Sequence, residues 1–325
     1  MAHAHSSPSE HSAHNHAHDG GHAHAGGHAH HHGHGPKSYG RAFAVGVTLN
    51  LAFVVIEIFY GIVSHSVSLL SDAGHNFGDV LGLAFAWGAS ALATVRPSAR
   101  RTFGYRRSTI VASMVNALLL LVVTGALVWE SIRRLFDPLP AQGMTMLVVA
   151  LVGAAINLGS ALLFMREDKD LNVKTAFTHL AADAVLSLGV AATGGLILLT
   201  NWLWLDPVMS LLLAVTIFVG TWSLLRQSLN LMLDAVPEGI ETEHVRDFLS
   251  GLPGVLEVHD LHIWGMSTTE TALTAHLVMN NPCQPGFLAE ACSQLHSKFD
   301  IDHSTLQLDP VDAPSPCSLA SDDVV

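Results

Sequence analysis

The stretch Ser71-Asp72-Ala73-Gly74-His75-Asn76-Phe77-Gly78-Asp79 puts ionisable side chains inside a long apolar segment. His75 and Asp79 are four residues apart, so on a helix they lie on one face, about one turn from each other. The same spacing returns in a second apolar segment, where His179 precedes Asp183 by four residues. Ionisable groups at bilayer depth are costly and are usually functional. Two imidazoles and two carboxylates from facing helices would complete a tetrahedral site for a divalent metal.

The composition of the chain indicates an integral, multi-pass membrane protein. Only 13% of its 325 residues are charged, whereas soluble domains average about 25%, and the mean hydropathy is +0.39. Six apolar segments approach the ~20 residues that cross a bilayer as a helix. They cover residues 41–63, 67–95, 108–132, 144–165, 175–199 and 207–228. We therefore predict a transmembrane domain of six helices over residues 38–233.

Loop charge predicts how these helices are oriented. The loops at 96–107 and 166–174 carry eight Lys and Arg residues on one side of the membrane. Only Arg133 and Arg134 lie near the other side. Because Lys and Arg gather in cytoplasmic loops, we expect both termini to be cytoplasmic, in the inner membrane if the source is bacterial. The Arg-rich loop at 96–107 is expected to contact anionic lipid of the bilayer.

The two ends of the chain have the composition of tails. Residues 1–35 hold 13 of the 22 His. Such a stretch has little to bury, so we predict a disordered His-rich tail over 1–37 that binds transition metals weakly. A purification tag is the alternative, although the irregular spacing of the His favours a native tail. Residues 311–325 are rich in Pro, Ser and Asp and are predicted to be a flexible C-terminal tail.

Residues 234–310 have the pattern of a compact α+β cytoplasmic domain. The expected order is α-β-β-α-β, with helices at 241–252 and 287–299 and strands at 255–266, 269–279 and 304–308. From Asp234 to the end, the chain has 15 acidic and two basic residues. This acidity argues against a nucleic-acid partner and suits either a cation-handling surface or a simply solubilising one.

The charge of the His75, Asp79, His179 and Asp183 set predicts what it could transport. Zn²⁺ with two carboxylates and two neutral imidazoles sums to zero charge, and so does the same cage holding two protons. Both loaded states can therefore sit in a low-dielectric membrane. Metal and protons compete for these ligands, so we expect metal efflux driven by inward protons. Mixed nitrogen and oxygen donors suit Zn²⁺, with Co²⁺, Ni²⁺ and Cd²⁺ as competitors.

Other polar residues in apolar segments have more than one interpretation. Asp72 shares a helix face with Asp79 and could be a relay, an entry ligand, or merely a group near the interface. The remaining ones are more simply hydrogen-bond partners between helices: Glu57, Asn50, Asn116 and Asn157. In the C-terminal part, periodicity alone leaves open whether the histidines are exposed strand residues or metal ligands: His259, His262, His276 and His303.

The motifs at 68–79, 103–107, 233–237 and 303–309, with the His179/Asp183 pair, resemble the cation diffusion facilitator family of proton-coupled zinc and cobalt exporters. The resemblance runs from about Gly40 to Asp309. It implies six helices, a homodimer and a ferredoxin-like cytoplasmic domain. It also implies a transport site between the second and fifth helices, made of His75, Asp79, His179 and Asp183.

The resemblance further implies a cytoplasmic metal site, at which zinc would act as a regulatory ion. Its ligands would be His259, His276, His303 and Asp309, and His262 becomes the less favoured candidate. Many relatives carry a His-rich loop between the fourth and fifth helices, but here the loop 166–174 has no His and the His-rich segment is N-terminal. The physiological metal is therefore open from sequence.

Two other classes of function compete with a transporter. A membrane-anchored metal sensor or store would use the tail and the cytoplasmic domain, but it leaves His75 and His179 unexplained. An intramembrane metalloenzyme would need an open metal position and a general base. The sequence has no HExxH motif and no candidate nucleophile near the four residues. We therefore expect a divalent metal efflux transporter and no enzymatic activity.

Overall fold

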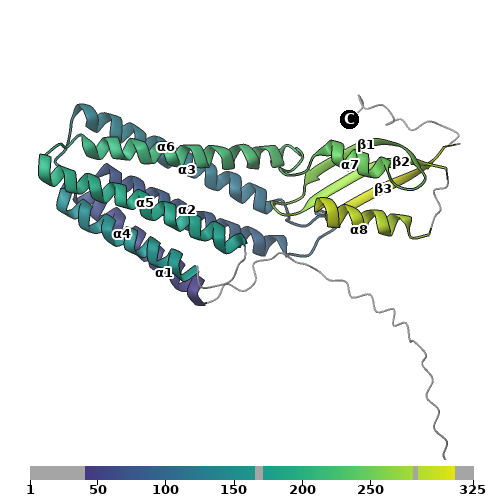
Figure 1. The fold of residues 1–325 in the computed structure, drawn as a ribbon, viewed down its shortest axis with the longest axis horizontal. Helices are drawn as coiled ribbons and strands as arrows, with labels where there is room; N and C mark the ends of the chain where they lie inside the picture. Colours follow the sequence, from purple (N-terminus) through teal and green to yellow (C-terminus); the bar gives the residue numbers. More distant parts are fainter. Residues whose placement is uncertain (1–40, 165–170, 281–284, 312–325) are drawn as a thin grey trace, which may run out of the picture. The chain divides into compact units, whose positions relative to one another are not determined.

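A computed structural model describes residues 41–164, 171–280 and 285–311 of the chain. In this part of the chain, six long helices come first and a small α+β domain follows (Figure 1). The predicted His-rich tail at 1–37 and residues 312–325 of the predicted C-terminal tail lie outside the described residues.

The six long helices begin and end within a few residues of the predicted apolar segments. They are α1 (Arg41–Val63), α2 (Val67–Ala93), α3 (Ser108–Phe136), α4 (Gly143–Phe164), α5 (Leu171–Thr200) and α6 (Leu205–Met232). Among the described residues, α3 to α6 contain four stretches that are long and apolar enough to cross a membrane. The described apolar part of α1, Thr48–Val63, is shorter. Helix α2, which carries the polar stretch Ser71–Asp79, is not among these four.

The start of α2 is held by a carboxylate from α6. Asp206 lies in the first turn of α6 and is 1% exposed. It accepts hydrogen bonds from the backbone N–H groups of Val67 and Ser68, at 2.8 and 3.1 Å. The hydroxyls of Ser66 and Ser68 also donate to it, at 2.7 and 2.6 Å. A negative charge at a helix N-terminus satisfies free N–H groups and complements the helix dipole. These bonds tie the N-terminus of α2 to α6.

Helices α4 and α5 approach each other closely at a pair of glycines. A Cβ atom added at Gly194 would lie 2.8 Å from the carbonyl oxygen of Gly143 and 2.7 Å from the backbone nitrogen of Leu147. Real Cβ atoms do not approach backbone atoms this closely, so only glycine fits at position 194. Small residues at helix crossings are how membrane helices gain packing contacts. Helix α5, which carries His179 and Asp183, is therefore packed directly on the α4 backbone.

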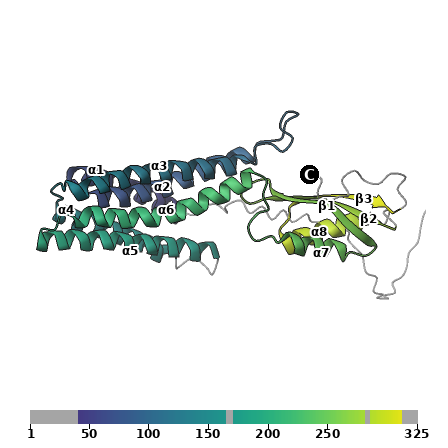
Figure 2. The same cartoon turned by 90° about the horizontal axis from the view of Figure 1, so that it is seen from above.

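The C-terminal part forms a three-stranded sheet with two helices on one face (Figure 2). Its elements are α7 (Thr242–Ser250), β1 (Val255–Gly265), β2 (Thr271–Met279), α8 (Phe287–Phe299) and β3 (His303–Pro310). Strand β2 lies in the middle, antiparallel to β1 and parallel to β3. The parallel pair is possible because α8 provides the crossover that a hairpin cannot. The predicted α-β-β-α-β order is found.

Alternation along β2 separates the core of this domain from its polar face. Leu273, Ala275, Leu277 and Met279 are fully buried and join Leu295 of α8 in one apolar cluster. Successive side chains on a strand point to opposite faces, so His276 lies on the face away from the helices. In β1 the pairing register shifts between His259 and His262. Asp260, inside this irregular turn of the strand, has a φ of 51°.

Candidate metal centres

The first centre lies between α2 and α5, and each helix contributes one His and one Asp. His75 Nε2 is 3.1 Å from Asp183 Oδ1, and His179 Nε2 is 3.2 Å from Asp79 Oδ2. Each imidazole thus contacts the carboxylate of the other helix. Within the helices, the His75–Asp79 and His179–Asp183 pairs are 4.0 and 3.6 Å apart. The four predicted side chains therefore lie next to one another, with His179 in contact with both carboxylates.

These spacings suit a small divalent ion. Ligand atoms about 2.0 Å from a tetrahedral Zn²⁺ are about 3.3 Å from one another, which is close to the nitrogen–oxygen distances of 3.1–4.0 Å found here. One potential ligand atom each from His75, Asp79 and Asp183 lie within 4.8 Å of one another. The His75 and His179 ring centroids are 6.0 Å apart.

Burial is uneven across this centre. The Asp183 side chain is 3% exposed and that of His75 is 20% exposed, whereas His179 is 48% exposed. Asp183 thus forms the floor of the centre, and His179 stands at its edge. A charged floor of this kind needs a cation or protons to neutralise it, because an isolated buried carboxylate is costly.

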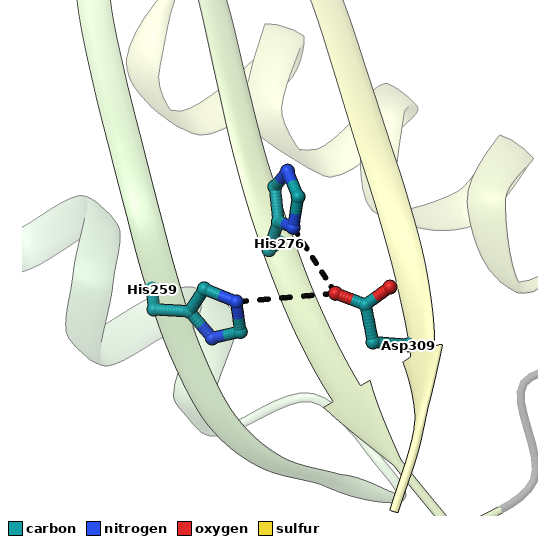
Figure 3. Close-up of side chains that lie close together, drawn as sticks. All are labelled: His259, His276 and Asp309. Carbon is teal, nitrogen blue, oxygen red and sulfur yellow. Dashed lines mark hydrogen bonds and ion pairs between the residues drawn. The ribbon is translucent and has the colours of Figure 1, made fainter. Parts of the chain in front are cut away.

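The second centre lies on the polar face of the sheet and takes one residue from each strand (Figure 3). His259 of β1 and His276 of β2 are direct cross-strand partners, and Asp309 of β3 completes the group. Asp309 Oδ2 is 3.0 Å from His276 Nδ1 and 3.9 Å from His259 Nε2. One ligand atom from each residue lies within 4.8 Å of the other two.

Within the second centre, His259 is the residue whose surroundings most favour metal binding. Its side chain is 4% exposed, and neither ring nitrogen has a hydrogen-bond partner among the described residues. A buried polar atom without a partner costs about 1–3 kcal/mol. An ion bound at Nε2 would remove part of that cost, so the arrangement can hold a metal through His259, His276 and Asp309.

Two predicted histidines do not belong to this group. His303 pairs with Ala272, whereas Asp309 pairs with Val278 at the far end of the same strand. Six residues of extended strand correspond to about 20 Å. The prediction that His303 and Asp309 of the same chain share a site is therefore wrong. The cause is that β3 is longer than expected and runs straight from His303 to Pro310. His262, the less favoured candidate, also lies outside the three-residue group.

Sequence reasoning missed Asp260 as a residue of the second centre. Its Oδ2 is 3.5 Å from His276 Nε2, and its Oδ1 is 2.9 Å from His262 Nε2. His276 is thus held between Asp309 and Asp260. A carboxylate on the second nitrogen of a ligating imidazole orients the ring and raises its basicity. The positive φ of Asp260 is a backbone feature that the local sequence does not reveal.

Comparison with known proteins identifies the family. Residues 43–233 match the cation efflux transmembrane domain, and residues 237–311 match the cytoplasmic domain of cation efflux proteins. The chain belongs to the cation efflux family. This membership confirms the resemblance to the cation diffusion facilitators. Members of this family are transporters, so this cation efflux protein is a membrane transporter and not an enzyme, and the metalloenzyme alternative falls away.

Three relatives from bacteria illustrate the range of the family. The chain is 35% identical over 277 residues to the metal cation efflux system protein CzcD of Cupriavidus metallidurans, covering 84% of this chain and 88% of that protein. It is 33% identical over 271 residues to the zinc transporter ZitB of Escherichia coli, covering 82% and 86%. It is 28% identical over 275 residues to a cadmium, cobalt and zinc/H(+)-K(+) antiporter of Bacillus subtilis, covering 83% and 88%.

Proposed function

We propose that this protein exports divalent metal cations in exchange for protons, with His75, Asp79, His179 and Asp183 as the transport site. Zn²⁺ is the foremost substrate, and Co²⁺, Ni²⁺ and Cd²⁺ are alternatives. The observation that carries the proposal is the crosswise pairing between α2 and α5, in which each imidazole contacts the carboxylate of the opposite helix at 3.1–3.2 Å.

The crosswise contacts explain why metal and protons exclude each other. An ionised carboxylate can only accept, so the hydrogen in each contact lies on the imidazole Nε2. A metal ion that takes the same nitrogen must displace that hydrogen. The site is therefore either hydrogen-bonded or metal-loaded. A proton arriving from outside would favour the hydrogen-bonded form and release the metal. The antiporter of Bacillus subtilis, whose name pairs zinc with H⁺, supports this coupling.

The donor set supports zinc among the possible metals. Two imidazoles and two carboxylates balance the charge of one divalent ion and suit a tetrahedral geometry. An all-oxygen site would favour Mg²⁺ or Ca²⁺ instead, and Cu(I) prefers sulfur ligands. The zinc transporter of Escherichia coli, 33% identical to this chain, supports the same choice.

The proposed setting is a homodimer in the bilayer, with six spans and both termini in the cytoplasm. The domain at 234–310 would be ferredoxin-like and would dimerise, in keeping with its match to the cytoplasmic domain of the family. Zn²⁺ bound at His259, His276 and Asp309 would act there as a regulatory ion. The His-rich tail at 1–37 would bind transition metals weakly.

Zinc flux in proteoliposomes tests the proposal. A dye inside the vesicles reports zinc entry, and the pH gradient is set in either direction or collapsed. We expect flux to follow the proton gradient in the wild type and to fall to background in His179→Ala. His244→Ala is the matched control, since that side chain is 68% exposed on α7. Bound zinc is counted separately, because the cytoplasmic centre should stay loaded in both variants.

Two results would contradict the proposal. Flux that ignores the direction of the proton gradient would remove the exchange mechanism. Intact flux in His179→Ala would remove the transport site. If the wild type bound zinc without moving it, the chain would be a membrane-anchored metal sensor or store.

A further inference from the structure

A pair of carboxyl groups is buried between α1 and α2, outside the metal centre. Glu57 of α1 is 0% exposed and Asp72 of α2 is 1% exposed. Asn76, which contacts Glu57, follows Asp72 by four residues on α2, so Asp72 and Asn76 lie on the same face of that helix. Asn76 Nδ2 donates to Glu57 Oε2 at 3.3 Å, and Ser187 Oγ of α5 donates to Asp72 Oδ2 at 2.8 Å. The pair is thus enclosed by three helices.

The second oxygen of each carboxyl group lacks a hydrogen-bond donor among the described residues. Glu57 Oε1, Asp72 Oδ1 and Asn76 Oδ1 are buried, and none has a partner among the described residues. In the same part of the chain, no Lys or Arg forms an ion pair with either carboxyl group. Two ionised carboxylates side by side in a place without water or a counter-charge are strongly disfavoured. A proton held between them removes one charge and supplies the missing donor.

The pair is one helical turn from the metal centre on two helices at once. Asp72 precedes His75 by three residues on α2, and Ser187 follows Asp183 by four residues on α5. Beyond Asp72 on α2 lie His75 and Asp79, and before Ser187 on α5 lie His179 and Asp183, so the ionisable groups next to the pair along both helices are those of the metal centre. Helix α4 has no ionisable side chain, and Asp206 of α6 is engaged at the start of α2. The charge of the pair is therefore coupled to the charge of the metal centre.

We propose that Glu57 and Asp72 share a proton, and that this proton passes to the metal centre as the metal leaves. We call this pair of carboxyl groups the counter-ion site. The inference rests on the proposed exchange function and adds the place where the incoming proton waits. Asn76 and Ser187 both point hydrogens at the pair. These hydrogens would repel a bound metal ion or K⁺, but not a proton between two oxygens. Only protons move in this step: one passes from the carboxyl pair to the imidazole and carboxylate groups of the centre, and one arriving from outside replaces it on the pair.

Infrared spectroscopy of the full-length protein in lipid tests for the shared proton directly. A protonated carboxyl group has a carbonyl stretch that is distinct from that of a carboxylate and shifts in D₂O. We expect one such band to disappear in Glu57→Gln, which keeps the size of the side chain and the contact with Asn76. Glu130→Gln, where the carboxylate pairs with Arg133 and Arg134, should leave the band unchanged. A wild-type spectrum without the band, or an unchanged band in Glu57→Gln, would overturn the inference.

Flux measurements separate this inference from the proposed function. In Glu57→Gln we expect zinc to bind as in the wild type, but proton-driven flux to fall about tenfold or more. Losses of this size are typical when a residue next to the ligands of a metal site is replaced. Asp72→Asn should behave in the same way. If the wild type exchanges zinc for protons and Glu57→Gln does so equally well, the counter-ion site is wrong and the proposed function stands.

Two further results complete the test. A wild type that moves no zinc against a proton gradient would refute the proposed function itself. If flux depended on K⁺ and this dependence were lost in Glu57→Gln, the carboxyl pair would be a K⁺ site and the proton assignment would be overturned.

Discussion

The ligands of both centres are arranged so that each imidazole faces a carboxylate, but their local surroundings differ. In the α2–α5 centre, His75 and His179 both have carboxylate partners at 3.1–3.2 Å. In the sheet centre, His259 has no hydrogen bond on either nitrogen in the described part of the chain. The imidazoles of the first centre therefore have partners without a metal, whereas His259 of the second centre has two buried nitrogen atoms without a hydrogen bond in the described part of the chain.

His259→Leu is predicted to separate stability from metal binding. Without metal, a buried apolar side chain should stabilise the cytoplasmic domain by about 1–2 kcal/mol, because it removes two unpartnered nitrogen atoms. With zinc, the wild type should gain stability by mass action while the variant does not. Thermal unfolding of the full-length protein in detergent, with chelator or with zinc, measures both effects.

The matched control for His259→Leu is His262→Leu, which removes a side chain that is 41% exposed and outside the three-residue group. It should keep the zinc-dependent gain. An equal zinc-dependent gain in wild type and His259→Leu would show that His259 is not a ligand.

At the scale of elements, backbone contacts between helices hold the transport residues in place. The N-terminus of α2 is bound by Asp206 of α6, and the backbone of α5 meets that of α4 at Gly143 and Gly194. Contacts of this kind leave little freedom for helices to slide along each other. We therefore expect movement during transport to rotate whole helix pairs rather than to shift one helix along its partner.

Gly194→Ala is predicted to destabilise the α4–α5 pair. The new methyl group would meet backbone atoms at 2.7–2.8 Å, and these cannot move aside as the end of a side chain can. We expect a loss of about 1–3 kcal/mol, together with lower zinc flux, because His179 and Asp183 would be displaced. Gly195→Ala is the control, since nothing lies within 4 Å of its added Cβ. Equal melting temperatures for the two variants would contradict the close helix contact.

At the scale of the whole molecule, charge is divided between two parts of the chain. The part before Asp234 carries 12 acidic and 13 basic residues, whereas the part from Asp234 onward carries 15 and two. The basic residues of the first part gather in loops on one side of the helices, which favours a cytoplasmic position for those loops. The acidic domain would then lie on the side where metal is collected, and its charge would attract cations.

This orientation predicts the location of reporter fusions. A fusion at position 235, after α6, should be active only with a reporter that works in the cytoplasm. A fusion at position 202, in the turn between α5 and α6, should be active only with a reporter that works outside it. Each fusion is the control for the other, and a reversed result at either position would exclude six spans with cytoplasmic termini.

The sequence determined the helices, the order of elements in the cytoplasmic domain and the two His/Asp pairs that meet between α2 and α5. It could do so because these features are local. Apolar segments of a helical length and the four-residue spacing of His75 and Asp79 are periodic patterns that survive without tertiary contacts. The family resemblance added the pairing of the second and fifth helices.

Only the tertiary structure decided which distant side chains meet. Strand register separated His303 from Asp309, which the family resemblance had placed in one site, and it brought Asp260 to His276. The contact of Glu57 with Asn76 likewise depends on how α1 packs on α2. The physical reason is that register and helix packing are set by the fit of many side chains at once, so a shift of one residue changes every partner while leaving the local pattern intact.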